Sequence, residues 1–144
     1  MKKIIIFSFV FSLCTANLFA QEWRSDWDAA LVEAKQTNKK IILVFSGSDW
    51  CIPCIKLEKG IWETPSFIQY AQQHYVLFRA DFPKRKKNKL LETIQQMNEG
   101  LAAEYNPKGY FPLVVVLDSD GKTKGQLGYE KLTSEAYIAL IEQL

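Results

Sequence analysis

The sequence has 144 residues, of which 48% are hydrophobic and 24% are charged. This length suits one domain whose core is large enough to fold without disulfide staples. The formal net charge is only +2, whereas a nucleic-acid-binding domain concentrates a basic excess on one face. One basic run, residues 84–89 (KRKKNK), is interpreted as a solvated loop or a helix start, with a patch for an anionic partner as the alternative. The composition therefore argues against a nucleic-acid partner.

The first twenty residues have the pattern of a secretory signal peptide. Two lysines follow the initial Met, residues 4–13 are apolar, and residues 14–20 are more polar and end in Ala20. Such a pattern is typical of exported proteins. The apolar run is too short to cross a bilayer core, which needs about 20 helical residues.

We expect cleavage after Ala20, which leaves residues 21–144 as one domain with 16 basic and 16 acidic residues. The mature protein is then expected in the periplasm or outside the cell. Two alternatives stay open, namely lipidation at Cys14 and retention of the apolar segment as an uncleaved anchor.

The first half of the domain is expected to alternate helices with apolar strands. Residues 26–37 carry apolar side chains at helical spacing, with Ser25 or Asp26 available as N-cap. Residues 40–45 (KIILVF) and 75–80 (YVLFRA) are short apolar runs, which are typical of buried strands. Between these strands the pattern predicts one helix that continues through residues 56–62 and a second helix over residues 64–73.

The second half predicts an antiparallel arrangement. An amphipathic helix over 89–105 precedes a strand over 111–117, and Asp120-Gly121 turns the chain into a strand over 123–127. Residues 133–144 close the domain as a helix, with Thr133 as N-cap. A βαβ unit followed by a ββα unit predicts an α/β fold with one central mixed sheet and helices on both faces.

Outside the leader the sequence contains two cysteines, in the order Cys51-Ile52-Pro53-Cys54. A disulfide across so short a loop restrains the unfolded chain little, so a purely structural staple is a weak explanation. A closed zinc site needs four ligands, and the one histidine, His74, is expected at the surface. We therefore expect no metal and no cofactor, and we interpret Cys51 and Cys54 as a redox pair.

The predicted elements place this pair where a strand ends and a helix begins. The unpaired N–H groups of a first helical turn stabilise a thiolate there. Cys51 is therefore expected to be the exposed nucleophile, and Cys54 the thiol that resolves the mixed disulfide. Pro53 fits a first turn, where its missing N–H costs nothing. The loop between the cysteines has no cationic residue, which favours a reductant or isomerase partner over a strong oxidant.

The segment Trp50-Cys51-Ile52-Pro53-Cys54 after an apolar strand resembles the thioredoxin superfamily motif. Residues 45–51 (FSGSDWC), 56–58 (KLE) and 80–83 (ADFP) resemble small exported bacterial thioredoxin-like proteins. Those proteins are similar to the C-terminal domain of the disulfide-interchange membrane reductases. The resemblance covers residues 27–144 and implies a thioredoxin fold, protein thiols or disulfides as substrates, and a membrane or soluble redox partner.

The resemblance also implies a second active-site element. Pro112 matches the cis-proline that begins the third strand of the family, although a trans proline at a strand start remains the alternative. Phe111 then offers backbone groups to an extended substrate segment. Trp50, Ile52 and Pro53 are expected to complete the substrate-binding surface.

Two positions depart from the pattern of cytosolic thioredoxins. Phe45 stands where they have a buried Asp, and Leu77 stands where they have its Lys partner. Losing both avoids a lone buried charge, but it leaves open which group exchanges a proton with Cys54. The nearest carboxylates in sequence, Asp49 and Glu58, are interpreted as surface groups.

Three functions fit these observations. The favoured one is a thiol–disulfide oxidoreductase that acts on proteins of the cell envelope. The alternatives are a non-catalytic binding or chaperone module, which would use the same groove, and a thiolate metal carrier, which His74 supports poorly.

Overall fold

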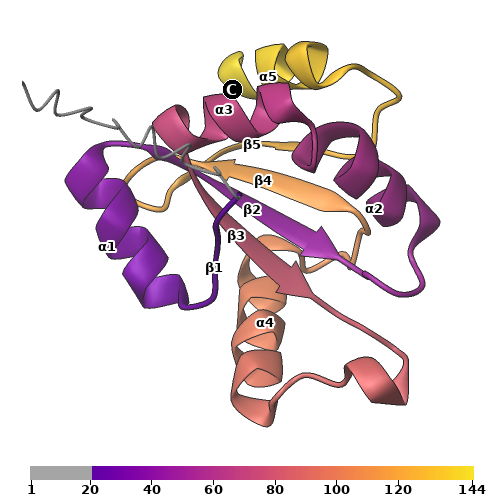
Figure 1. Ribbon diagram of the computed structural model, residues 1–144. Coiled ribbons are helices and arrows are strands. Elements are labelled where there is room, and N and C mark those ends of the chain that lie inside the picture. Colours follow the sequence, from indigo (N-terminus) through magenta and orange to yellow (C-terminus); the bar gives the residue numbers. More distant parts are fainter. Residues whose placement is uncertain (1–20) are drawn as a thin grey trace, which may run out of the picture.

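The structure, a computed structural model, describes residues 21–144, so the predicted leader lies outside the described residues. One five-stranded sheet runs through the domain in the order β1-β3-β2-β4-β5 (Figure 1). The strands β1, β3 and β2 are parallel, whereas β4 is antiparallel to β2 and β5 is antiparallel to β4. Their bounds are Trp23–Arg24 (β1), Lys40–Ser46 (β2), Tyr75–Asp81 (β3), Leu113–Leu117 (β4) and Thr123–Leu127 (β5).

Helices cover both faces of the sheet (Figure 1). One face packs against α1 (Trp27–Thr37) and α4 (Glu92–Tyr105). The other face packs against α2 (Ile52–Leu57), α3 (Pro65–His74) and α5 (Ser134–Glu142). The α/β class, the mixed sheet and the two helical layers predicted from the sequence are confirmed.

The central strand β2 explains why its sequence is a continuous apolar run. Ile42 and Val44 point into the core under α2, α3 and α5, while Ile41, Leu43 and Phe45 point into the core under α1 and α4. Side chains alternate along a strand, so a strand that is buried on both faces needs apolar residues at every position.

The sequence predicts where one helix begins and misplaces the start of another. The helix expected to have Pro53 in its first turn begins at Ile52, as predicted, and its continuation, Glu58–Trp62, is a π-helix. The helix expected over 89–105 begins at Glu92, because the preceding residues form a 3-10 turn (Lys86–Asn88) and then an extended stretch. Hydrogen bonds from this turn to the Asp49 carboxylate override the local helical preference. The two-residue strand β1 was not predicted.

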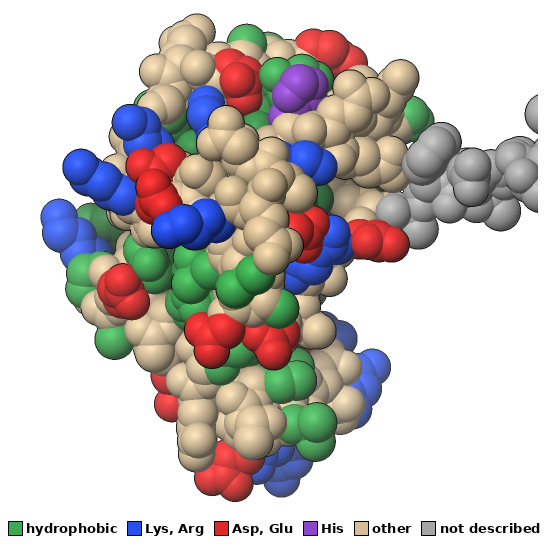
Figure 2. Space-filling view, turned by 90° about the vertical axis from the view of Figure 1, so that its left-hand side faces the viewer, with side chains coloured by type: hydrophobic (Ala, Val, Ile, Leu, Met, Phe, Trp, Pro, Cys, Tyr) green, Lys and Arg blue, Asp and Glu red, His purple; other side chains and the backbone are tan. Residues whose placement is uncertain are grey.

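The face of the molecule that carries α1 interleaves acidic and basic side chains (Figure 2). Ion pairs of this region include Arg24 with Glu33 and Lys35 with Asp120. Within residues 21–144, no helix combines the length and the apolar character that a membrane crossing requires.

Trp62 offers a test of the core under α3 and α5. It is fully buried, and its ring meets the rings of Trp23, Phe67 and Tyr137 edge-on. In the oxidised protein, Trp62→Ala is expected to lower the free energy of unfolding by about 3–5 kcal/mol, measured by urea denaturation. Val32→Ala, on the exposed side of α1, is the control and should cost less than about 0.5 kcal/mol. A loss below about 1 kcal/mol for Trp62→Ala would contradict close packing here.

Candidate redox site

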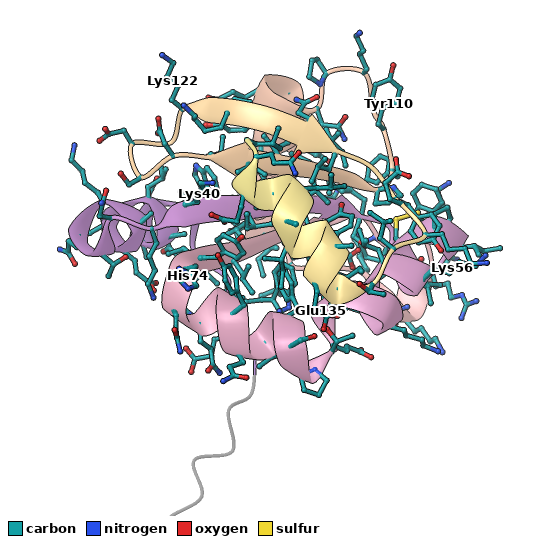
Figure 3. The ribbon with its side chains drawn as sticks, turned by 90° about the horizontal axis from the view of Figure 1, so that it is seen from above. Lys40, Lys56, His74, Tyr110, Lys122 and Glu135 are labelled. Atoms are coloured by element: carbon teal, nitrogen blue, oxygen red, sulfur yellow. A yellow bond between two sulfur atoms is a disulfide. The ribbon has the colours of Figure 1, made fainter. Side chains whose placement is uncertain are left out.

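Cys51 and Cys54 form a disulfide at the carboxyl end of β2, with their Cα atoms 5.2 Å apart. Figure 3 shows the bond on the side of the molecule that carries Lys56 and Tyr110, away from Lys122. The order strand, short turn, helix places the pair at the junction that the sequence predicts.

Cys51 is the N-cap of α2. Its Sγ accepts a hydrogen bond from the backbone N–H of Cys54 at 3.3 Å. Both cysteines are only 4% exposed in the disulfide, so exposure does not single out Cys51 as the sequence analysis expected. The cap position singles out Cys51 as the nucleophile, because its sulfur accepts a hydrogen bond from a helix N–H group. Such a contact stabilises a thiolate.

The turn before Cys51 is closed by Gly47. Its carbonyl accepts hydrogen bonds from the N–H groups of Trp50 and Cys51, at 3.2 and 2.9 Å. A side chain at position 47 would overlap the Trp50 indole. Glycine is therefore required for the indole to fold back against the turn.

Trp50 lies at the edge of the redox site and not against α1. Its Nε1 donates to the carbonyl of Phe82 at 2.7 Å, and its ring meets Phe111 at 5.4 Å between centroids. The ammonium group of Lys84 lies 3.8 Å from the centre of the indole, in a cation–π contact. Two segments distant in sequence thus hold Trp50 beside the cysteines.

A groove of about 530 Å³ borders α2 on the side of β4 and β5. It brings together three of the predicted substrate-binding residues, Pro53, Phe111 and Pro112, and the peptide bond between Phe111 and Pro112 is cis. Tyr110 and Tyr129 also line it, and no sequence signal pointed to either. The predicted residues Trp50 and Ile52 are exposed but do not line this groove.

The entry to β4 is fixed by a buried side chain, Asn106. Its amide group donates to the carbonyl of Tyr110 at 2.8 Å, and its amide oxygen accepts the Tyr110 N–H at 2.9 Å. Gly109 between them has a φ of 68°, which glycine adopts readily. Sequence reasoning missed Asn106, since an Asn near a Pro and a Gly indicates only a turn.

A cavity of about 260 Å³ lies behind Cys54 and is lined by Glu58 and Arg79. These two side chains are about a quarter exposed and form an ion pair, and Arg79 also lies over the Trp23 ring. Glu58 is one helical turn after Cys54, and its N–H donates to the Cys54 carbonyl. The interpretation of Glu58 as a surface carboxylate is therefore wrong: it is a partly buried, paired group beside Cys54.

Asp49 is likewise a structural carboxylate. It accepts hydrogen bonds from the backbone N–H groups of Lys84 and Arg85, at 2.9 and 3.0 Å, and from the Asn88 amide at 2.9 Å. The Lys84 N–H is the largest influence, and together these donors lower the pKa of the Asp49 carboxyl. This contact holds residues 84–88 in the turn that delays the start of α4.

His74 is exposed and stacks on Tyr70, with 4.1 Å between ring centroids. Within residues 21–144, no group of three or more His, Cys, Asp or Glu side chains is placed to hold a metal ion.

Residues 22–119 match the model of a family described as thioredoxin-like. The chain belongs to this family. Disulfide bond reductase DsbH of Chlamydia pneumoniae is 36% identical over 130 residues, which cover 90% of this chain and 74% of that protein. Thioredoxin-related protein DsbJ of the same organism is 28% identical over 106 residues, and the match spans only 30% of its length.

Solved structures agree with the family. A DsbH oxidoreductase structure superposes with a TM-score of 0.78 at 34% identity, covering 85% of this chain and 82% of the other. The oxidised DsbD C-terminal domain of Neisseria meningitidis gives a TM-score of 0.57 at 22% identity, covering 85% of this chain and 98% of that domain, and supports the fold. The thioredoxin fold implied by the cysteine motif is confirmed.

The pKa of Asp49 makes its contact sensitive to acid. A lowered carboxyl pKa means that the anchored loop favours the charged form; the contact is complete above the unfolded value of about 3.9 and is lost as the pH falls through the lower folded value. We expect the amide proton shifts of Lys84 and Arg85, followed by NMR, to titrate with a midpoint below about 3.9. In Asp49→Asn this titration should disappear. A midpoint at or above the unfolded value would contradict the anchoring.

Proposed function

We propose that this protein reduces disulfides of protein substrates in the cell envelope. The chain is a thiol–disulfide oxidoreductase, as its family, its DsbH relative and its Cys51–Cys54 pair indicate. The proposal adds the direction of transfer, the substrate class and the location. The observation that carries it is the Cys51 sulfur, which caps α2 beside an open groove.

The reaction begins with the reduced pair. The Cys51 thiolate attacks one sulfur of the substrate disulfide, forms a mixed disulfide and releases the other substrate sulfur as a thiolate. The N–H groups at the start of α2, including that of Cys54, stabilise the attacking thiolate.

Resolution then requires that Cys54 lose its proton. The thiolate of Cys54 attacks the Cys51 sulfur of the mixed disulfide and releases the second substrate thiolate, so two electrons have passed to the substrate. Phe45 and Leu77 are buried and apolar, and neither can accept that proton. We propose that the Glu58 carboxylate accepts the Cys54 proton in the cavity that Glu58 and Cys54 both line. The ion pair with Arg79 holds this carboxylate in place.

The groove provides a place for the substrate backbone. In residues 21–144, the N–H and C=O groups of Phe111 have no hydrogen-bond partner. An extended segment that pairs with these groups would lie across the exposed ring of Tyr110 and beside Pro53. Its disulfide would then face the α2 cap.

The direction rests on two observations. The relative that covers 90% of this chain is named a disulfide bond reductase, and no cationic residue lies between Cys51 and Cys54. The cell-envelope location rests on the leader pattern in residues 1–20. A reductant in that compartment needs a dithiol donor that regenerates the Cys51 and Cys54 thiols, either a membrane or a soluble redox partner.

The reduction potential of the pair tests the direction. Equilibration with glutathione is expected to give a potential near or below about −230 mV, whereas a value near about −120 mV would indicate an oxidant. Cys54→Ser should accumulate a mixed disulfide with substrate, because Cys51 then attacks but nothing resolves the product. Cys51→Ser should abolish exchange. Substrate binding that survives in Cys51→Ser without any exchange in the wild type would favour the non-catalytic binding module instead.

Glu58→Gln tests the proton acceptor. The mixed disulfide should resolve at least about tenfold more slowly near neutral pH, since a positioned general base contributes about 10²–10⁴-fold. Stopped-flow measurement of the resolution step against pH separates this loss from the attack by Cys51, which should be unchanged. Glu63→Gln is the matched control, because Glu63 lines the same cavity but is exposed. Equal rates for wild type and Glu58→Gln across the pH range would eliminate Glu58 from the step.

A further inference from the structure

We propose that residues 84–89, the basic loop, form a docking surface for an acidic protein segment that lies next to the disulfide or dithiol presented to Cys51. The inference rests on the proposed function, since it names the kind of protein that the redox site meets. It develops the alternative reading of this run, a patch for an anionic partner, over that of a solvated loop.

The basic loop concentrates cations that the domain itself does not neutralise. Five of its six residues are Lys or Arg, and all five are exposed. Within residues 21–144, none of these side chains forms an ion pair with a carboxylate. Residues 21–144 have equal numbers of acidic and basic residues only when the loop is counted, and the α1 face mixes the two signs (Figure 2).

The carboxylates closest to the loop are already engaged. Asp49 accepts three hydrogen bonds, two of them from the loop backbone. Asp81 accepts from the N–H and the hydroxyl of Ser48, and Glu99 accepts from the Gln95 amide. Asp81 and Glu99 share a pocket of about 230 Å³ with the loop, and neither pairs with its cations. Because five cations face only these three carboxylates, the loop keeps a local positive excess.

The loop is attached to the redox turn and not merely near it. Asp49, two residues before Cys51, binds the loop backbone, and the ammonium group of Lys84 lies on the Trp50 ring. Trp50 in turn donates to the carbonyl of Phe82, just before the loop. The positive charges are therefore held at a fixed place beside the active-site edge.

An apolar area adjoins this charge. Trp50, Ile52 and Ile55 are exposed by 37%, 65% and 36%. A segment whose disulfide contacts this area would extend its flanking residues over the basic loop. Acidic flanking residues would be attracted over about 10 Å at 0.1 M salt, and such complementarity raises the rate of encounter more than the final affinity.

The test uses disulfide-containing peptides that differ only in the flanking residues, either four Glu or four Ser. The reduced, mature protein is mixed with each peptide in about 20 mM and about 500 mM salt, where the screening lengths differ severalfold. The second-order rate constant for the acidic peptide is expected to exceed that for the neutral one by about tenfold at low salt. This advantage should vanish at high salt.

The variant Lys86→Gln, Lys87→Gln, Lys89→Gln removes three charges while leaving Lys84 on Trp50 and the Asp49 contacts intact. It should lose most of the preference for the acidic peptide. The matched control removes Lys35, Lys122 and Lys124, which are exposed and lie elsewhere, and Lys122 lies on the side opposite the disulfide (Figure 3). This control should keep the preference.

A neutral small disulfide, 2-hydroxyethyl disulfide, separates this inference from the proposed function. If it does not react, the oxidoreductase itself fails. If it reacts normally but the two peptides react equally, the docking surface is refuted. Equal peptide rates, combined with binding to phosphatidylglycerol-containing vesicles that the loop variant alone loses, would show that the basic loop serves a membrane surface instead.

Discussion

The junction between β2 and α2 is the feature on which the rest of the site depends. Within a few residues the chain leaves a strand that is buried on both faces, turns back through Gly47 and starts a helix. At the start of that helix the Cys51 sulfur accepts a hydrogen bond from the backbone N–H of Cys54. The buried strand fixes where the turn begins, and the packing of Leu57 and Trp62 fixes how the helix leaves it. The reactive sulfur is thereby placed by the core rather than by a flexible loop.

Segments far apart in sequence complete this junction from two sides. The chain after β3 contacts it through Trp50 and Asp49, while the chain before β4 approaches through Phe111, which Asn106 supports from behind through Tyr110. The hydrogen bonds among these contacts each use a backbone group on one partner, whereas Trp50 and Phe111 meet ring to ring. The arrangement therefore depends more on the path of the chain than on the chemistry of any single side chain.

The fold and the position of the redox pair could be predicted from the sequence, because both depend on local patterns of residues. Continuous apolar strands, the N-cap residues Asp26 and Thr133, and the cysteine spacing are local signals, and they predicted the fold and the position of the redox pair. The pairing of Glu58 with Arg79, the clamp of Asn106 on Tyr110, and the late start of α4 were missed. Each is decided by a contact that forms only after folding, so no local pattern could reveal it.

The anchor between Asp49 and the chain after β3 is made to backbone N–H groups at Lys84 and Arg85, so it accepts any residue except proline at those two positions. Residues 85–87 and 89 can consequently drift in sequence while the path of the loop and the geometry at sulfur are retained. If the basic loop is the docking surface that we propose, substitutions at these exposed positions would change which protein substrates are preferred without altering the chemistry at the two cysteines.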